Sequence, residues 1–318
     1  MNSKKITERF YAAYAKDEGI LLNSSSGGMF TVLSDFYLKS GNAVVCCIYD
    51  SFNDKVHLSL VTSVEERNRA RGSKYIQSTV GDTFKECEEY LKDREKRIIF
   101  FGTGCQAAGF MKYMALKGLE SQIVVVDIIC HGVPSPSIWY DYINRRKEKT
   151  PGTVEYLSFR DKRTGWEASS SIVRINQTDI DISDYKKYMY GPMTLRPSCY
   201  TCKYAKIVRD SDLTIGDFWG IKEHYKSMYN PKGVSVVIVH SEQGMKLLET
   251  ISDDLVLQET KEEYSVQPNL QGATTISSQR KNYMKTYVSK GFNRLYRKYA
   301  DTSFYGKLKR KIFKFLHI

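Results

Sequence analysis

Short apolar runs and helical patterns alternate along the first half of the chain. Residues 97–101 form an apolar run typical of a buried strand, and a helical pattern follows to about residue 116. Residues 123–129 repeat the strand pattern, and another helix is predicted at 137–146. Strands that alternate with helices are typical of βαβ units. Further predicted elements are a helix at 29–39, paired strands at 42–50 and 56–62, and a helix at 83–92.

The second half has a different pattern. Residues 154–161 and 170–176 alternate as antiparallel strands do, and a polar turn joins them. We therefore predict an α/β fold with α+β elements in the second half: a mixed sheet with flanking helices and a C-terminal basic amphipathic helix. Further strands are predicted at 213–218 and 234–240, and a helix at 242–251. The expected regions are 1–150, 151–279 and 280–318.

Composition places the chain among soluble globular proteins. Hydrophobic residues make up 42% of the 318 residues and charged residues 26%. Every apolar run is too short to span a bilayer, and residues 1–16 mix charges of both signs without the apolar stretch of a secretory signal. We therefore expect a cytoplasmic protein.

The net charge of +12 is concentrated at the C-terminus. Residues 280–318 hold 12 Lys or Arg and one acidic residue, so this tail carries +11. Residues 304–318 place apolar and basic side chains on opposite sides of a predicted helix. Such a helix favours an anionic membrane surface, so we expect a peripheral position on the inner face of the membrane. A helix docked on the protein body is the alternative. Because no recognised nucleic-acid-binding motif accompanies the charge, we expect no nucleic-acid partner.

Seven cysteines are the main chemical signal. In a reducing cytosol they are not expected to form disulfides, and a C-x-x-C motif there favours metal or redox chemistry. Cys105 and Cys130 each come at the end of one of the two predicted buried strands. If those strands are parallel neighbours, both thiols face the crevice at the carboxyl ends of the sheet. Cys199 and Cys202 form the C-x-x-C and complete four thiolates, the number that a 4Fe–4S cluster requires.

Other interpretations of the cysteines stay open. A free cysteine is commonly a small buried side chain, and we interpret Cys46, Cys47 and Cys87 in this way. The C-x-x-C turn is a poor core segment because its neighbours are polar. A zinc site on the same four cysteines is the sharper alternative. Structural zinc usually takes two C-x-x-C-like turns, whereas this chain has one such turn and two single cysteines, a layout that favours a cluster in a crevice.

Several stretches of the chain form a joint signature. They are GTGCQ at 102–106, DIICHGVPSP at 127–136, RPSCYTC at 196–202 and GDFWG at 216–220, with SSGG at 25–28 and GSKYIQS at 72–78. Together, and in this order from about residue 20 to 255, they resemble the β subunit of the coenzyme F420 hydrogenase/dehydrogenase family. The individual motifs are short, but their combination is specific.

The resemblance implies a flavoprotein that carries FAD and one 4Fe–4S cluster, with Cys105, Cys130, Cys199 and Cys202 as cluster ligands. It implies electron transfer to or from an organic substrate or a deazaflavin. Many relatives begin with a ferredoxin-like module, but this chain has no cysteine before Cys46. We therefore expect a separate donor protein such as a ferredoxin, with another subunit or direct transfer from reduced flavin as alternatives. The resemblance is nearest to members found among bacterial surface-polysaccharide genes. The family does not define their substrate, and we expect a small-molecule or lipid-linked glycan.

Two loops are candidates for FAD. Ser25, Ser26, Gly27 and Gly28 precede a predicted helix, and a helix N-terminus offers N–H groups and partial positive charge to phosphate. A serine N-cap of that helix explains the same residues without a ligand. The turn after the buried strand at 97–101 adds Gly102, Thr103 and Gly104 as candidates.

Four single side chains complete the candidate site. Arg71 and Lys74 are placed to meet phosphate or a reduced flavin, with a solvated surface pair as the alternative. His131 adjoins Cys130 and is, with Lys74, a candidate catalytic residue; a hydrogen-bonded loop histidine is the alternative. Trp219 is a candidate to cover a cofactor face, although such a tryptophan more often lies in a core.

The sequence thus leads to two functional hypotheses. The first is an FAD- and 4Fe–4S-dependent oxidoreductase that acts in surface polysaccharide biosynthesis. The second is a non-redox accessory protein of polysaccharide assembly, stabilised by zinc or by a structural cluster. A polar hairpin containing Arg160 and Trp166 has no role in either hypothesis.

Overall fold

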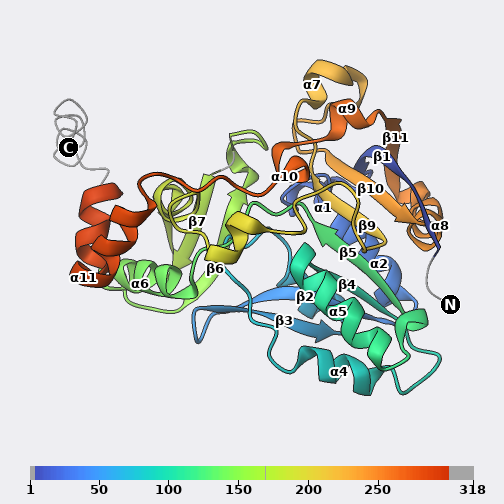
Figure 1. Ribbon diagram of the computed structural model, residues 1–318, viewed down its shortest axis with the longest axis horizontal. Helices are drawn as coiled ribbons and strands as arrows, with labels where there is room; N and C mark the ends of the chain where they lie inside the picture. The colour runs from blue at the N-terminus through green and yellow to red at the C-terminus, as the bar shows by residue number, and fades with distance from the viewer. Residues whose placement is uncertain (1–3, 169, 301–318) are drawn as a thin grey trace.

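The computed structural model describes residues 4–168 and 170–300. Within this part of the chain, an eight-stranded sheet forms a larger lobe, with the strand order β11-β1-β10-β9-β5-β4-β2-β3 (Figure 1). A three-stranded sheet, β6-β7-β8, belongs to a smaller lobe. The strands are β1 (Lys5–Ala15), β2 (Ala43–Asp50), β3 (Lys55–Val61), β4 (Ile98–Thr103), β5 (Ile123–Ile128), β6 (Val154–Asp161), β7 (Ser170–Ile175), β8 (Thr178–Asp181), β9 (Leu213–Asp217), β10 (Ser235–Ser241) and β11 (Leu255–Thr260).

Helices of very different lengths flank these sheets. The longer ones are α2 (Met29–Lys39), α4 (Thr83–Tyr90), α5 (Gly104–Leu116), α6 (Pro136–Lys147), α8 (Glu242–Thr250) and α11 (Arg280–Tyr299). The shorter ones are α1 (Glu18–Leu22), α3 (Val64–Asn68), α7 (Ile221–His224), α9 (Glu262–Ser265) and α10 (Pro268–Gln271).

Four neighbouring strands of the large sheet run parallel. β2 pairs with β4, β4 with β5, and β5 with β9 in parallel register, while β9 and β1 pair with β10 in antiparallel register. Parallel strands end at the same edge of a sheet, so the loops that follow β4, β5 and β9 lie side by side. The predicted neighbourhood of Cys105 and Cys130 depends on this pairing, and the structure confirms that β4 and β5 are parallel neighbours.

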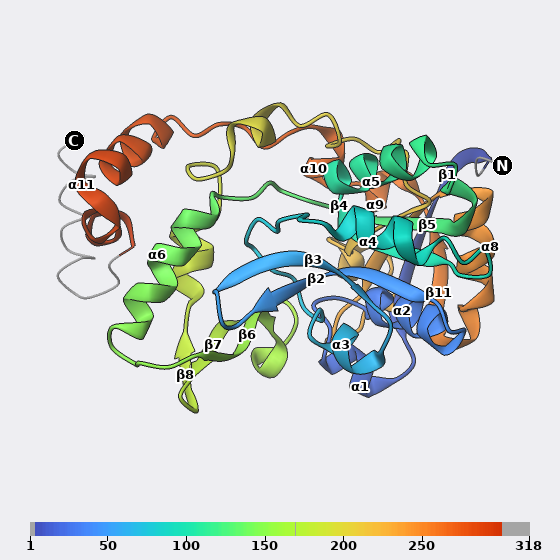
Figure 2. The ribbon, with the colours of Figure 1, turned by 90° about the horizontal axis from the view of Figure 1, so that it is seen from below.

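Helices cover both faces of the parallel strands, which explains their continuous apolar sequences. Ile99 and Phe101 of β4 pack with α2 on one face, while Ile98 and Phe100 pack with α4 and α5 on the other. Figure 2 shows α4 and α5 on one side of the sheet and α2 on the opposite side. The carboxyl edge of the sheet is therefore held by a core on each face.

The smaller lobe has an aromatic core of its own. Trp139 and Tyr142 of α6 pack against Phe159 of β6 and against Tyr283 and Tyr296 of α11. The described part of the basic C-terminal region is thus a helix docked on this lobe, with a kink where Gly291 adopts a φ of 71°. The segment 304–318, for which we predict an amphipathic helix, lies outside the described residues.

The predicted fold class is confirmed, with a mixed sheet and flanking helices. The large sheet takes strands from both sides of residue 150, and α6 packs with the smaller lobe. The division into regions 1–150, 151–279 and 280–318 stays a prediction. The strand β1 was not predicted, although it lies inside the large sheet. In the described part of the chain, no helix has the length and apolar character needed to cross a bilayer.

Candidate cofactor site

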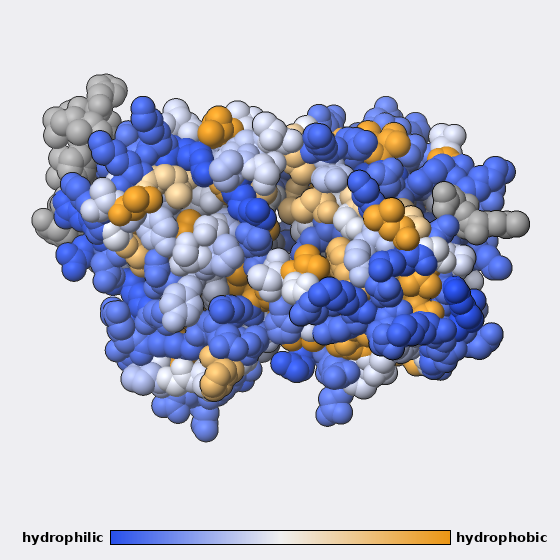
Figure 3. Space-filling view, turned by 60° about the horizontal axis from the view of Figure 1, so that its bottom comes forward, coloured by the Kyte–Doolittle hydropathy of each residue, from blue (hydrophilic) through white to orange (hydrophobic). Residues whose placement is uncertain are grey.

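The predicted cofactor residues gather around one cavity. It has a volume of 670 Å³, opens at the carboxyl edge of β4, β5 and β9, and extends to the loops 24–30 and 70–80. The smaller lobe contributes Arg160 of β6 and Tyr190 to its wall. Figure 3 shows the seam between the two lobes, which is hollowed near its centre. The volume is within the range of about 300–1,000 Å³ that is typical of ligand pockets.

Four cysteines from three separate segments line this cavity. Cys105 is at the start of α5, Cys130 follows β5, and Cys199 and Cys202 come from the turn after the smaller lobe. Burial raises the pKa of the Cys130 thiol to about 12, and the charges of Cys105, Cys199 and Cys202 also raise it. The four thiols that the sequence singles out therefore line the same cavity.

Backbone contacts hold the cysteine loops against each other. Gly132 N donates to Cys130 Sγ at 3.3 Å, and Arg196 N donates to Val133 O at 2.9 Å. Gly132 has a φ of 104°, and a Cβ there would lie 3.0 Å from Cys199 Cβ. Only glycine allows this approach without strain. The loop after β5 and the C-x-x-C segment are thus packed as one unit.

The remaining cysteines differ among themselves. Cys87 is buried in the core beneath α4 and α5, as predicted. Cys46 is buried and Cys47 half-buried, and both also line the cavity. Burial raises the pKa of both thiols, that of Cys46 to about 12. The thiols of Cys46 and Cys47 are therefore neutral at physiological pH and form an apolar part of the cavity wall.

The serine-rich turn does not cap the helix that follows it. The N-cap of α2 is Gly28, with a φ of 91° and no side-chain hydrogen bond. Ser25 Oγ accepts from Ser73 N at 2.6 Å, and Ser26 Oγ donates to Val234 O at 2.9 Å. Gly27 is turned toward the sheet, where its N–H donates to Ser235 Oγ at 2.9 Å. The serine side chains therefore hold the loop in place, and Gly28 leaves the N-terminus of α2 facing the cavity.

The second glycine-rich turn has a different organisation. Gly102, Thr103 and Gly104 line the cavity, but α5 carries a capping box in which Gln106 Oε1 accepts from Thr103 N at 3.1 Å. Thr103 Oγ1 also lies 3.2 Å from Cys105 Sγ. The Thr103 side chain thus lies beside the Cys105 thiol, and the role of this turn in FAD binding stays a prediction.

Arg71 and Lys74 both line the cavity, but their hydrogen bonding differs. Lys74 Nζ donates to the carbonyls of Ala70 at 2.8 Å and Arg71 at 3.1 Å, and to two others of the same loop. Burial lowers its pKa. Lys74 thus shapes the loop with its ammonium group. Arg71 Nε is buried and, among the described residues, has no hydrogen-bond partner.

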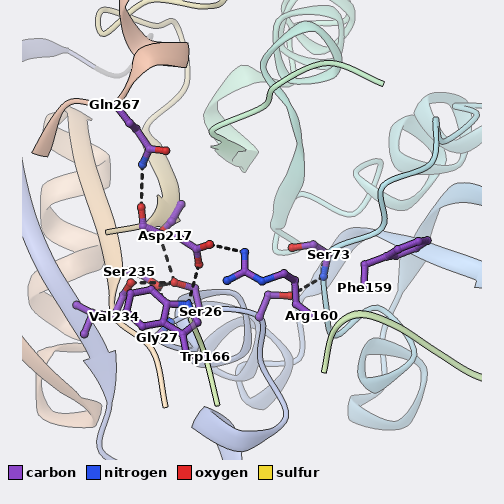
Figure 4. Close-up of polar contacts among 12 residues, drawn as sticks. Ser26, Gly27, Ser73, Phe159, Arg160, Trp166, Asp217, Val234, Ser235 and Gln267 are labelled. Atoms are coloured by element: carbon purple, nitrogen blue, oxygen red, sulfur yellow. Dashed lines mark hydrogen bonds and ion pairs between the residues drawn. The ribbon is translucent and has the colours of Figure 1, made fainter. Parts of the chain in front are cut away.

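A polar cluster joins the smaller lobe to the carboxyl end of β9. Arg160 Nη1 donates to Asp217 Oδ2 at 2.5 Å, and Trp166 Nε1 donates to Asp217 Oδ1 at 3.3 Å. Gln267 Nε2 donates to Asp217 O at 2.8 Å (Figure 4). Arg160 of the polar hairpin therefore contributes to the cavity wall, and Trp166 supports it through Asp217. Sequence reasoning missed this role, and the only signal was an unexplained pair of polar and aromatic residues at a turn.

Comparison with known proteins agrees with this arrangement. The sequence profile for the C-terminal part of the coenzyme F420 hydrogenase/dehydrogenase beta subunit matches residues 95–264, and the profile for its N-terminal part matches residues 10–85. The chain belongs to this family. It is a family of oxidoreductase subunits, and the four predicted ligands Cys105, Cys130, Cys199 and Cys202 fall within the C-terminal match.

One solved structure supports the fold. A chain of the F420-reducing NiFe hydrogenase complex from Methanosarcina barkeri, from a study of xenon derivatization, superposes with a TM-score of 0.56 at 15% identity. The match covers 92% of this chain and 91% of that chain. At this identity the likeness concerns the fold alone. No curated relative matches the sequence.

His131 and Trp219 form an aromatic pair at the cavity. Their rings stack with centroids 5.4 Å apart, and Trp219 is 50% exposed. Trp219 is thus outside the core, and its role in covering a cofactor face stays a prediction. Burial lowers the pKa of His131, so its ring is neutral at physiological pH and keeps one N–H donor. His131 O accepts from Thr274 Oγ1 at 2.7 Å, which fixes the loop beside Cys130.

Proposed function

We propose that this chain is an FAD- and 4Fe–4S-dependent oxidoreductase that passes electrons between the cluster and the flavin. Membership of an oxidoreductase family supports the general class. One observation carries the finer proposal: four thiols from three segments meet on a cavity that also receives the uncapped N-terminus of α2.

The donor set fits an iron–sulfur cluster better than a single zinc ion. Tetrahedral zinc with bonds of about 2.3 Å holds its sulfurs only about 3.8 Å apart. Among the described residues, no three Cys, His, Asp or Glu side chains are grouped closely enough to hold one ion. A 4Fe–4S cluster binds each cysteine through a separate iron, so its ligands stand wider apart. Cys105, Cys130, Cys199 and Cys202 would be those ligands.

The part of the cavity formed by the start of α2 fits a cofactor with a pyrophosphate. α2 is 11 residues long, and Gly28 and Met29 at its N-terminus line the cavity without a capping side chain. Arg71 adds a guanidinium whose buried Nε has no partner among the described residues. Unpaired donors of this kind are satisfied by an anionic ligand. We assign this end to the FAD phosphates.

The protein's own residues have distinct tasks in this proposal. When bound, the cluster supplies one-electron transfer and the flavin connects it to two-electron chemistry. Gly132 allows the cysteine loops to meet, and His131 offers a neutral N–H donor beside Cys130. Arg160, held by Asp217, places a fixed positive charge on the cavity wall. The two lobes together line the cavity.

The proposed partners follow from charge and exposure. Cys105 is exposed, and the neighbouring rim carries the exposed cations Arg196, Lys203 and Lys206. This rim suits an acidic electron carrier such as a ferredoxin. We further propose a small-molecule or lipid-linked glycan substrate in surface polysaccharide biosynthesis, and contact of residues 304–318 with an anionic membrane. The helix α11, which precedes that segment, contains basic but no acidic residues.

Purification under anaerobic conditions tests the proposal. The protein is expected to be brown, with visible absorbance that decreases on addition of dithionite, and to release FAD into the supernatant on denaturation. Colourless protein with one zinc ion per chain and no flavin would contradict the redox function. That result would favour the metal-stabilised accessory protein instead.

A further inference from the structure

Arg209 is a buried arginine that the proposed reaction leaves without a role. It follows the C-x-x-C segment, is 5% exposed and contributes to the cavity wall. Its Nη1 forms an ion pair with Asp127 Oδ2 at 3.1 Å. Its Nη1 also donates to Ile128 O at 3.3 Å, and its Nε donates to Lys206 O at 2.9 Å. One guanidinium thus bonds three separate oxygens.

These partners belong to segments that carry cavity cysteines. Asp127 and Ile128 end β5 just before Cys130, and Lys206 is in the loop that follows Cys202. The third cysteine segment approaches the same group. A Cβ on Gly104, the residue before Cys105, would lie 3.5 Å from Arg209 Nη1 and 3.4 Å from Asp127 Oδ2. The Arg209–Asp127 pair therefore lies where all three segments meet.

Other contacts fix this pair in place. Thr214 Oγ1 donates to Asp127 Oδ1 at 2.5 Å, and Lys5 Nζ donates to Arg209 O at 3.1 Å. Both charged side chains are nearly fully buried, at 3% and 2% exposed. A buried pair of this kind cannot lose one partner without leaving the other charge uncompensated. A lysine in place of Arg209 keeps the charge but lacks the planar fork that bonds several oxygens.

We propose that Arg209 is a positioning residue that holds the three cysteine-bearing segments at the spacing needed for an iron–sulfur cluster. The inference rests on the proposed cluster and adds a residue that the four ligands alone do not define. Arg209 lines the cavity and is paired with Asp127, so its guanidinium would place a positive charge beside a bound cluster, which would supply one-electron transfer.

The test compares Arg209→Lys and Arg209→Gln with wild-type protein after anaerobic reconstitution. The readouts are iron and sulfide per chain, the rate of iron loss to a chelator, and the midpoint potential from EPR-monitored titration. Loss of an outer-shell partner typically weakens metal binding roughly 10–100-fold, and we expect iron retention to fall by a factor in this range in both variants. We expect the midpoint potential to become more negative in the Gln variant, with a smaller change in the Lys variant because it keeps the charge.

Arg146 provides the matched control. It is a partly buried arginine that pairs with Asp184 at 2.5 Å in the smaller lobe, and its contacts with Tyr142 and Tyr296 lie in that lobe too. Arg146→Gln is expected to lower the melting temperature without changing iron retention or potential. Iron retention and potential that stay at wild-type values in Arg209→Gln would overturn the proposal, and so would equal effects in Arg146→Gln. Wild-type protein that takes up no iron would overturn the proposed function itself.

Discussion

Gly132 and Cys199 are packed so closely that a Cβ on Gly132 would lie 3.0 Å from Cys199 Cβ. The same Cβ would lie 2.7 Å from Leu195 Cδ1, and the φ of 104° is one that other residues rarely adopt. This contact joins the loop after β5 to the C-x-x-C segment. It is the point at which two of the three cysteine-bearing segments meet.

Gly132→Ala is therefore expected to separate these loops. We expect a loss of about 1–3 kcal/mol in the free energy of unfolding, as is typical for strained backbone, and a lower iron content after reconstitution. Urea denaturation and iron analysis check the two effects. Gly118→Ala is the control, since Gly118 also has a positive φ, of 66°, but has open space around it. Equal iron content in both variants would contradict the role of this contact.

Arg71→Gln tests the flavin end of the cavity. The variant removes the positive charge and the buried Nε donor, and this Nε has no hydrogen-bond partner among the described residues. Since a hydrogen bond to a charged group contributes about 1.5–3 kcal/mol, we expect FAD affinity to fall at least about tenfold. Fluorescence titration of the apoprotein with FAD measures this change.

The neighbouring Arg69→Gln is the matched control for this prediction. Arg69 is exposed, and its side chain is outside the cavity wall. We expect its FAD affinity to match that of the wild-type protein. A similar loss in both variants would mean that overall charge, rather than a defined contact, determines FAD binding.

The buried side chain of His240 is expected to make the free energy of unfolding depend on pH. Burial lowers its pKa to about 3, against 6.5 for an unperturbed group, and its Nε2 lies 2.8 Å from Thr214 Oγ1. Between these two values the unfolded chain binds a proton that the folded protein does not. The free energy of unfolding therefore falls as the pH falls from 6.5 toward 3, by at most about 1.4 kcal/mol per pH unit from this group.

Urea denaturation across this pH range checks the prediction. The His240→Gln variant is expected to lose this part of the pH dependence, so its stability relative to wild type improves as the pH falls. His224→Gln, at an exposed position of α7, is expected to parallel the wild-type curve. A constant difference between His240→Gln and wild type from pH 6.5 downward would contradict the assignment.

Removal of residues 301–318 tests the membrane partner. The deleted segment contains five Lys or Arg, and each basic group near an anionic leaflet contributes about 1 kcal/mol. We expect the full chain to sediment with vesicles that contain phosphatidylglycerol, and the truncated chain to bind them much more weakly. Vesicles of phosphatidylcholine alone are the control. Equal sedimentation of both chains with the anionic vesicles would reject the tail as the contact.

The sequence was sufficient for the elements with continuous apolar or helical periodicity. β4, β5, α2 and α5 were predicted within a few residues, because each is buried along one face or two. β1 was not, since its first half is polar and exposed at alternate positions and its place depends on pairing with the distant strands β10 and β11. Local pattern carries no information on such pairing.

The candidate site also contains some residues that the sequence singled out and others that only the structure shows. Cysteines at strand ends and in a C-x-x-C were visible because their residue type is informative by itself. Arg160 with Asp217, and Arg209 with Asp127, were not assigned, since each pair joins residues far apart in the chain. The open N-terminus of α2 was also undecided, because serines in the sequence suit a cap as well as a phosphate loop. Only the structure shows that Gly28 takes the cap position.

Iron and sulfide analysis of anaerobically reconstituted protein tests the central proposal most directly. The wild-type chain is expected to hold about four irons and about four sulfides, the content of one 4Fe–4S cluster. Cys199→Ser is expected to lose most of this iron, and Cys87→Ala, in the core beneath α4 and α5, to keep it. Full iron content in Cys199→Ser, or none in the wild-type protein, would contradict a cluster held by the four cavity cysteines.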